Sequence, residues 1–170
     1  MTAGTPLTPV LADLATEFTA LAPGDRLQFL VDLADELPEV PAHIAARRDD
    51  MEPVTECQSP VFVLVELDGS REPDPMLRGV RVHVRAPAQS PTTRGFAAAL
   101  CQGLDGVSAA EVLALADDLP DRWGLSGVVS PLRLNGMAGL LRRVKRQVRE
   151  LTGSVAPAAP PAPSAGPATR

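Results

Sequence analysis

The sequence predicts an α+β fold, and three observations support this prediction. Apolar residues recur at helical spacing near both ends of the chain. Two segments rich in β-branched residues, 61–67 and 80–84, lie between those ends. The second segment alternates apolar and polar residues, which is typical of a strand with one buried face. We therefore expect an N-terminal helical hairpin, a small antiparallel sheet and a long C-terminal helix.

The composition favours one domain with an aliphatic core. Of the 170 residues, 45% are hydrophobic but only 3% are aromatic. From residue 152 the composition changes to Ala, Pro, Ser and Gly, which cannot bury enough apolar surface to order itself. We expect a domain over residues 1–151 and a disordered tail over residues 152–170.

Charge and the lack of targeting patterns limit the partners. The net charge of -5 argues against nucleic acid or an anionic membrane surface as the main partner. The first nine residues do not resemble a signal peptide, and no apolar run reaches the roughly 20 residues that cross a bilayer. The two cysteines are too few and too far apart for a disulfide framework. We expect a cytoplasmic protein with reduced thiols.

The N-terminal hairpin is predicted from caps and apolar stripes. Thr8 is a suitable N-cap and Pro9 a suitable first-turn residue. Pro23-Gly24 ends the first helix, and Asp25 is expected to cap the second. The two apolar stripes are Leu11, Leu14, Phe18 and Leu21, then Leu27, Leu30, Val31, Ala34 and Leu37.

The strands come next along the chain. Residues 42–52 are mixed and charged and are expected to form a connector. Residues 61–67 form an apolar strand that ends in the turn Asp68-Gly69. In residues 80–85 the valines alternate with arginines and a histidine, so the valines should face the core. The two strands should pair as an antiparallel hairpin, with a short third strand near residues 52–56.

Helices complete the predicted fold. Thr92 or Thr93 is expected to cap the first of them, and Ser108 with Glu111 forms a capping box for the next. The last helix is expected over residues 135–151. It has an apolar face and a basic face, and we expect the basic face to be solvated.

Cys57 is the strongest candidate for a functional residue. It lies in the polar loop Thr55-Glu56-Cys57-Gln58-Ser59-Pro60, just before the first long strand. Another protein can reach a cysteine in such a loop, and reactive cysteines are partly exposed. The alternative is a small buried residue, since free cysteine is often buried. Glu56 argues against a reactive thiol, because a nearby negative charge raises a thiol pKa.

The remaining cysteine and the histidines favour structural roles. Cys101 shares a helical stripe with apolar neighbours and is expected in the core. His43 and His83 do not form a ligand set with the cysteines, and a zinc site needs about four well-spaced ligands, so no metal site is predicted. A Cys-His catalytic pair with His83 stays open, although a solvated strand histidine is the commoner case.

The segment Cys57-Gln58-Ser59-Pro60-Val61-Phe62 resembles the Cys-Gln-Ser-x-Val-Trp segment of the SufE family, which accepts sulfur from a cysteine desulfurase during iron–sulfur cluster assembly. Further segments match the family in order and at compatible spacing, over about residues 10–150. They are Leu37-Pro38, Arg94-Gly95, Ser108-Ala109-Ala110-Glu111-Val112 and Pro131-Leu132-Arg133-Leu134-Asn135-Gly136-Met137. The resemblance implies a SufE/IscU-like α+β fold, with helices packed on one side of the sheet.

The chain departs from the family pattern at three places. Glu56 stands where the family usually has glycine, and we expect it to stiffen the loop and alter the acidity of the thiol. Phe62 replaces the tryptophan. Ala88-Gln89-Ser90-Pro91 stands where the family often has an acidic residue that contacts the desulfurase. A divergent branch with its own matched desulfurase fits these departures.

The resemblance also implies a function. Cys57 would take persulfide sulfur from a PLP-dependent, SufS-like cysteine desulfurase and pass it to an iron–sulfur cluster scaffold. The chain would be a sulfurtransferase-type carrier without a cofactor of its own, because PLP stays with the partner. Glu56, Gln58, Ser59 and Arg133 are expected to support the loop or contact the partner. Two alternatives stay open: a non-catalytic module that regulates a desulfurase, and a thiol redox sensor.

Overall fold

A three-stranded antiparallel sheet organises the computed structural model, which describes residues 6–154. The strands β1 (Glu52–Pro53), β2 (Phe62–Leu67) and β3 (Val80–Arg85) lie in that order across the sheet. The predicted hairpin is confirmed, with all six residues of β2 paired to β3. The predicted third strand is also present, but it is only two residues long.

The sheet buries one face, as the alternation in β3 predicts. Val63 lies opposite Val84, and Val65 lies opposite Val82. All four side chains are buried, whereas Arg85 on the other face is exposed. Cross-strand pairs of β-branched residues stabilise a sheet by packing side by side on one face. The helices therefore pack on the valine face of the sheet.

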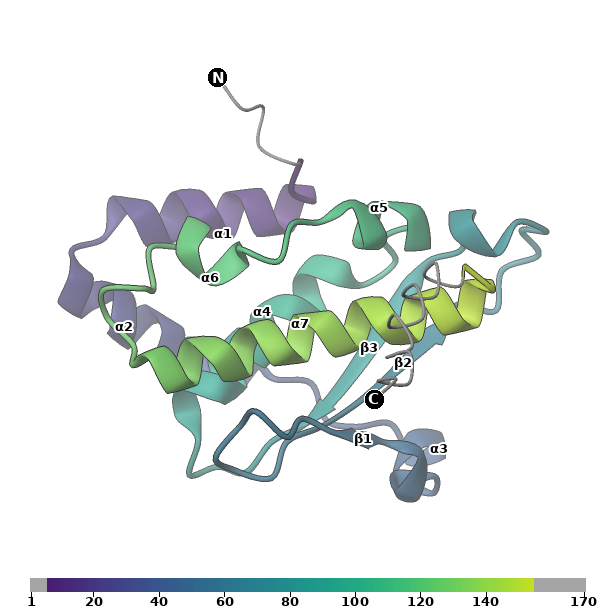
Figure 1. Cartoon of the computed structure of the whole chain (residues 1–170), viewed down its shortest axis with the longest axis horizontal. Coiled ribbons are helices and arrows are strands. Elements are labelled where there is room, and N and C mark those ends of the chain that lie inside the picture. The colour runs from purple at the N-terminus through teal and green to yellow at the C-terminus, as the bar shows by residue number, and fades with distance from the viewer. Residues whose placement is uncertain (1–5, 155–170) are drawn as a thin grey trace, which may run out of the picture.

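The helices cover that face and each other (Figure 1). Two of them contact the sheet directly, α7 over β2 and α4 over β3, and the N-terminal helices pack on α4. A small aromatic cluster of Phe18, Phe96 and Trp123 fills the region between helices in an otherwise aliphatic core. The helices are α1 (Pro9–Ala20), α2 (Pro23–Asp32), α3 (Ala42–Ala45), α4 (Pro91–Leu104), α5 (Ala109–Ala114), α6 (Leu119–Arg122) and α7 (Pro131–Thr152).

The Arg94-Gly95 pair fixes the crossing of α2 and α4. A Cβ atom on Gly95 would lie 1.7 Å from the carbonyl oxygen of Leu30, so no other residue allows the two backbones to approach this closely. Arg94 donates to the carbonyls of Ala86, which follows β3, and Ala34, which follows α2. The crossing places the first turn of α4 beside α2, and this turn forms part of the site described below.

Several helices begin earlier than predicted, and the cause is the same each time. The expected caps Asp25 and Thr92 or Thr93 are wrong, because α2 begins at Pro23 and α4 at Pro91. The last helix likewise begins at Pro131, capped by Ser130, before the predicted residue 135. Proline suits the first helical position, since it has no amide hydrogen to leave unpaired and its φ is already helical. In this chain these prolines therefore mark helix starts.

The connecting segments also contain more helix than expected. The predicted connector over residues 42–52 includes α3 and a short 3-10 turn, Arg48–Asp50. The second predicted helix tightens into a 3-10 turn, Leu33–Glu36, after α2. Another 3-10 turn, Pro75–Leu77, precedes β3. The capping box of Ser108 and Glu111 at the start of α5 is confirmed, with both of its hydrogen bonds formed.

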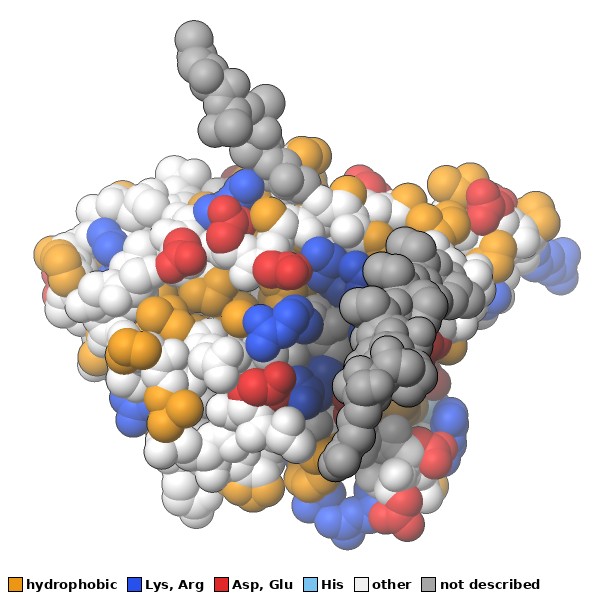
Figure 2. Space-filling view, viewed as in Figure 1, with side chains coloured by type: hydrophobic (Ala, Val, Ile, Leu, Met, Phe, Trp, Pro, Cys, Tyr) orange, Lys and Arg blue, Asp and Glu red, His pale blue; other side chains and the backbone are white. Residues whose placement is uncertain are grey.

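The basic face of α7 is not simply solvated, which corrects the prediction. Lys145 is buried and donates to the Leu115 carbonyl and to Asp117. Gln147 is also buried, and it accepts from the amide of Val65 and donates to the carbonyl of Val63. The Gln147 side chain thereby forms hydrogen bonds with the backbone edge of β2 where the short strand β1 has ended. Figure 2 shows acidic and basic side chains interspersed on this face of the molecule.

The helix α7 ends at Thr152 and is capped by Gly153, which adopts the left-handed conformation typical of a helix C-terminus. The predicted disordered tail lies outside the described residues from residue 155 onward. Within residues 6–154, none of the helices combines the length and the apolar character that crossing a bilayer requires.

Candidate functional site

Cys57 lies in the loop that joins β1 to β2. The loop is closed at its base by the amide of Val54, which donates to the carbonyl of Val61 at 2.8 Å. The amide of Cys57 donates back to the Val54 carbonyl at 3.1 Å and so forms a tight turn. The Cys57 side chain is partly exposed. The local sequence had predicted a cysteine in a polar loop before a strand, and the structure places it there.

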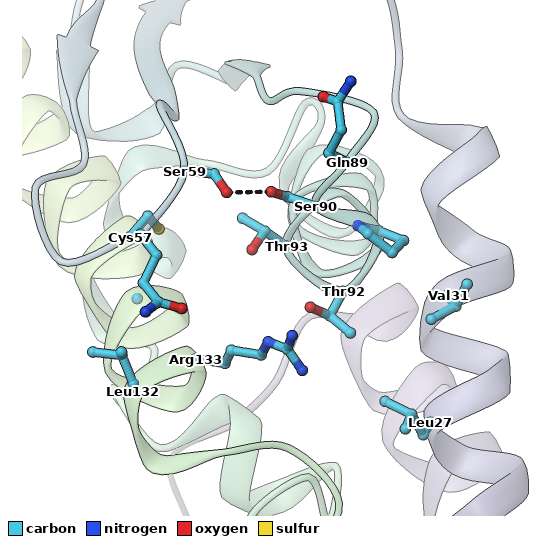
Figure 3. Close-up of a pocket in the computed structure, with 13 residues that line it drawn as sticks. Leu27, Val31, Cys57, Ser59, Gln89, Ser90, Thr92, Thr93, Leu132 and Arg133 are labelled. Atoms are coloured by element: carbon cyan, nitrogen blue, oxygen red, sulfur yellow. Dashed lines mark hydrogen bonds between the residues drawn. The ribbon is translucent and has the colours of Figure 1, made fainter.

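The loop opens onto a recess of about 250 Å³ (Figure 3). Three segments far apart in the sequence form its wall: the cysteine loop, the first turn of α4 and the first turns of α7. The side chains of Leu27 and Val31 on α2 close the far side. The remaining lining residues are Cys57, Gln58, Ser59, Gln89, Ser90, Pro91, Thr92, Thr93, Leu132, Arg133 and Gly136.

Four of the predicted site residues therefore share one recess. Ser59 is tied to the N-cap of α4, because the Ser90 hydroxyl donates to the Ser59 hydroxyl at 2.5 Å. Gln58 and Arg133 line the recess, and Figure 3 shows the guanidinium of Arg133 directed toward Thr92. The fifth predicted residue, Glu56, points the other way and lies against α7.

Two glycines on α7 make room for the loop. A Cβ atom on Gly136 would lie 3.0 Å from the sulfur of Cys57, and one on Gly139 would lie 2.9 Å from the carboxyl carbon of Glu56. Residues three apart lie on the same face of a helix, so the pair forms a flat strip on which residues 56 and 57 rest. Glycine inside a helix costs about 1 kcal/mol relative to alanine, which indicates a close approach at such positions.

Arg143 is the residue that sequence reasoning missed. Its side chain donates to the carboxylate of Glu56 at 2.5 Å and to the hydroxyl of Thr55 at 3.0 Å. Its Nε lies 3.3 Å from a carboxylate oxygen of Glu52. The sequence had indicated a solvated arginine, yet its side chain is only 15% exposed. One available signal was the unexplained Glu56, which would require a cation somewhere in the fold.

The site holds the Cys57 thiol in its protonated form at neutral pH. Burial raises the pKa of Cys57 above the ordinary 9.0, the charge of Glu56 adds to the rise, and Arg143 opposes it. Partial burial also opposes ionisation of Glu56, but its own backbone amide, Arg143 and Arg142 outweigh that effect and lower its pKa. The first turns of α4 and α7, whose amides carry partial positive charge, line the recess in which a thiolate would form.

The other cysteine and the histidines lie away from the recess. Cys101 is buried in the core, as predicted, and burial raises its pKa to about 12. His83 does not line the recess with Cys57; it contacts the carboxylate of Glu66 at 3.1 Å, as does His43. Among residues 6–154, no group of three or more His, Cys, Asp or Glu side chains is arranged to hold a metal ion.

Comparison with known proteins gives a consistent result. The model of the SufE family, described as an Fe-S metabolism associated domain, matches residues 12–148. SufE-like proteins from two strains of Mycobacterium tuberculosis are 45% identical over 150 residues, which is 88% of this chain and 99% of theirs. The solution structure of a hypothetical protein from Thermus thermophilus superposes with a TM-score of 0.72 and 31% identity, covering 86% of this chain and 98% of that one. The chain therefore belongs to the SufE family of proteins associated with iron–sulfur metabolism.

Proposed function

We propose that this protein accepts sulfur from a PLP-dependent cysteine desulfurase on Cys57 and passes it on for iron–sulfur cluster assembly in the cytoplasm. The single observation that carries the proposal is the placement of Cys57. It lies on a loop, partly exposed, at the wall of a recess of about 250 Å³. Membership of the SufE family supports the link to iron–sulfur metabolism.

The proposed chemistry is an exchange between a thiol and a persulfide. The Cys57 thiolate attacks the outer sulfur of a persulfide on the desulfurase. A new S–S bond forms on Cys57 while the original S–S bond breaks, and the desulfurase cysteine leaves as a thiolate. That thiolate takes up the proton that Cys57 gave up. The transferred sulfur keeps its oxidation state, so the step needs no external oxidant or reductant.

The recess suits the product of this exchange. Its volume exceeds the roughly 30 Å³ that one water occupies in the liquid, so there is room for one more sulfur atom beside Cys57. Gln58, Ser59 and Arg133 line it and supply polar groups and one positive charge to its wall. A persulfide is more acidic than a thiol, so we expect Arg133 and the helix N-termini to stabilise its anion. We propose that Glu56 supports the loop from the other side.

Mass measurement of the protein after turnover tests this function. The protein is incubated with its cognate desulfurase, PLP and free cysteine, then weighed without reduction. We expect one added sulfur atom on Cys57, none in Cys57→Ser, and normal loading in Cys101→Ser, the matched control. An unmodified Cys57 together with unstimulated desulfurase turnover would refute the proposal.

Two further measurements, combined with the mass measurement, separate the two alternatives. If Cys57→Ser still stimulates the desulfurase and the wild type gains no sulfur, the protein is a binding module and not a sulfur carrier. If peroxide oxidises Cys57 reversibly without any desulfurase, and desulfurase adds no sulfur, the protein is a redox sensor. The burial of Cys101 does not favour the sensor, because a buried thiol with a strongly raised pKa is a poor resolving partner.

A further inference from the structure

We propose that the ion pair between Glu56 and Arg143 is a latch that holds Cys57 against α7, so that both are positioning residues for sulfur transfer. The inference rests on the proposed function only in its last step. Its first step, that the pair restrains the cysteine, concerns the protein by itself. The hydrogen bonds and ion pairs of the loop support this first step.

The two arms of the loop are held in different ways. On the arm that follows Cys57, the Ser59 hydroxyl is bonded to Ser90 on α4. On the arm that precedes it, the side chains of Thr55 and Glu56 both bond to Arg143 on α7. Cys57 lies between these two anchors. Releasing Arg143 therefore removes the side-chain anchors of the arm before the thiol and leaves only its backbone turn to Val54, while the other arm stays attached.

The ion pair is well placed to act as a restraint. The side chains of Arg143 and Glu56 are 15% and 25% exposed, so water screens the pair less than one on the open surface. A second arginine, Arg142, approaches Glu56 only to 3.7 Å and is itself half exposed. The neighbouring carboxylate, Glu52, also contacts Arg143 at 3.3 Å, but it has further partners in Arg146 and Gln147. Arg143 is therefore the main partner of Glu56.

Gly139 is what allows the pair to form. The carboxyl group of Glu56 lies so close to this position that a methyl group there would come within 2.9 Å of it. The sulfur of Cys57 rests one helical turn away, at Gly136. The Glu56 carboxylate and the Cys57 thiol therefore both pack against the strip formed by Gly136 and Gly139. Displacing Glu56 moves the residue bonded directly to Cys57.

The latch has two separable effects on the thiol. It limits how far the sulfur is exposed, which lowers the reaction rate of the thiolate with any disulfide. It also sets the local charge, because Glu56 disfavours the thiolate and Arg143 favours it. Removing either partner opens the latch, but the two removals leave opposite charges behind. Rate and acidity can therefore be measured separately.

The test measures the reaction of Cys57 with dithiodipyridine, a neutral disulfide, as a function of pH. Glu56→Gln, Arg143→Met and the double variant are compared with the wild type in a Cys101→Ser background. Arg149→Gln is the control, since it removes a positive charge from α7 at a residue that does not pair with the loop. Gly139→Ala is a further variant, because it displaces Glu56 while keeping both charges.

We expect the limiting rate at high pH to rise about threefold in each single variant, the size expected of a partly exposed ion pair. The double variant should rise no further than the singles. The pKa of Cys57 should fall further in Glu56→Gln than in Arg143→Met, because both variants expose the sulfur but leave opposite charges beside it. Gly139→Ala, which keeps both charges, should raise the rate with a fall in pKa between these two. Arg149→Gln should match the wild type.

Unchanged limiting rates in both single variants would overturn the proposal, as would independent, multiplying effects in the double variant. A merely structural role would lower the unfolding midpoint without this difference in the Cys57 pKa between the two single variants. The outcome does not depend on sulfur acceptance, because the probe needs no desulfurase. With the desulfurase present, the same variants should change kcat for transfer and leave KM unchanged. A latch that opens as expected in a protein that takes no sulfur would refute the proposed function alone.

Discussion

Replacement of Gly136 by alanine tests whether the thiol of Cys57 rests on α7. The added methyl would lie 3.0 Å from the Cys57 sulfur and 3.6 Å from its Cα. The second distance is an ordinary contact, so the backbone can stay in place. The first is too short, and the sulfur must rotate away by a few tenths of an ångström. The substitution therefore stabilises the helix through its higher helix propensity and destabilises the Cys57 side chain by forcing it off its rotamer.

The two contributions are of similar size. Alanine in place of glycine inside a helix stabilises by about 1 kcal/mol. Forcing a side chain off its rotamer costs about 0.5–1.5 kcal/mol. In the wild-type background we therefore expect almost no net change in the free energy of unfolding. In a Cys57→Ala background the sulfur is absent, so Gly136→Ala should stabilise by the full amount of about 1 kcal/mol.

Urea unfolding followed by the fluorescence of Trp123 measures both values, because this single tryptophan is fully buried. The difference between the two backgrounds is the coupling between position 136 and the sulfur. Gly24→Ala serves as a control, since that helical glycine has nothing within 4 Å and should respond alike in both backgrounds. Equal effects of Gly136→Ala in the two backgrounds would show that the thiol does not rest on the helix.

Three further outcomes follow from the structure. Gly95→Ala should destabilise by at least about 1–3 kcal/mol, because its methyl would collide with a backbone carbonyl that cannot rotate away; an unchanged urea midpoint would contradict the close crossing. Burial opposes ionisation of Glu66, but its contacts with two histidines outweigh burial and hold its pKa below the ordinary 4.5. Ionised Glu66 therefore stabilises the fold above pH 4.5, and this stabilisation is lost as the pH falls through the lowered pKa. In acid unfolding, the free energy of unfolding of Glu66→Gln should therefore fall less steeply with decreasing pH than that of the wild type. Alkylation of Cys57 should keep accelerating beyond pH 9.0 while Cys101 stays unmodified in the folded protein; a plateau for Cys57 below that pH would contradict its burial.

Much of the fold follows from local patterns. The alternation in β3, the stripe that holds Cys101 and the capping box at α5 each depend on residues within one turn or one strand of each other. The prolines were harder to interpret, because the same residue can end one element and begin another. Pro91 and Pro131 begin helices in the structure, and the helix starts were misplaced because these prolines were not assigned to the first helical turn.

The site was only half predictable. The position of Cys57 in a polar loop could be inferred, because it depends on its immediate neighbours. The partner of Glu56 could not, since Arg143 lies 87 residues away in the sequence. Periodicity tells which face of a helix is buried, but it does not tell which loop that face contacts. Gly136 and Gly139 were the available clue, because two helical glycines three residues apart indicate that another chain segment lies close.

Glu56 has a different meaning once its partner is known. From the sequence alone, a carboxylate beside Cys57 argues against a reactive thiol, because it disfavours the thiolate. In the structure Arg143 opposes that charge, and burial is the largest cause of the raised pKa of the thiol. Burial depends on the position of the loop, which the Glu56–Arg143 pair controls. The residue that departs from the family's usual glycine therefore acts on Cys57 mainly through geometry: a partner that loosens the pair would expose the sulfur and ease its ionisation in the same step.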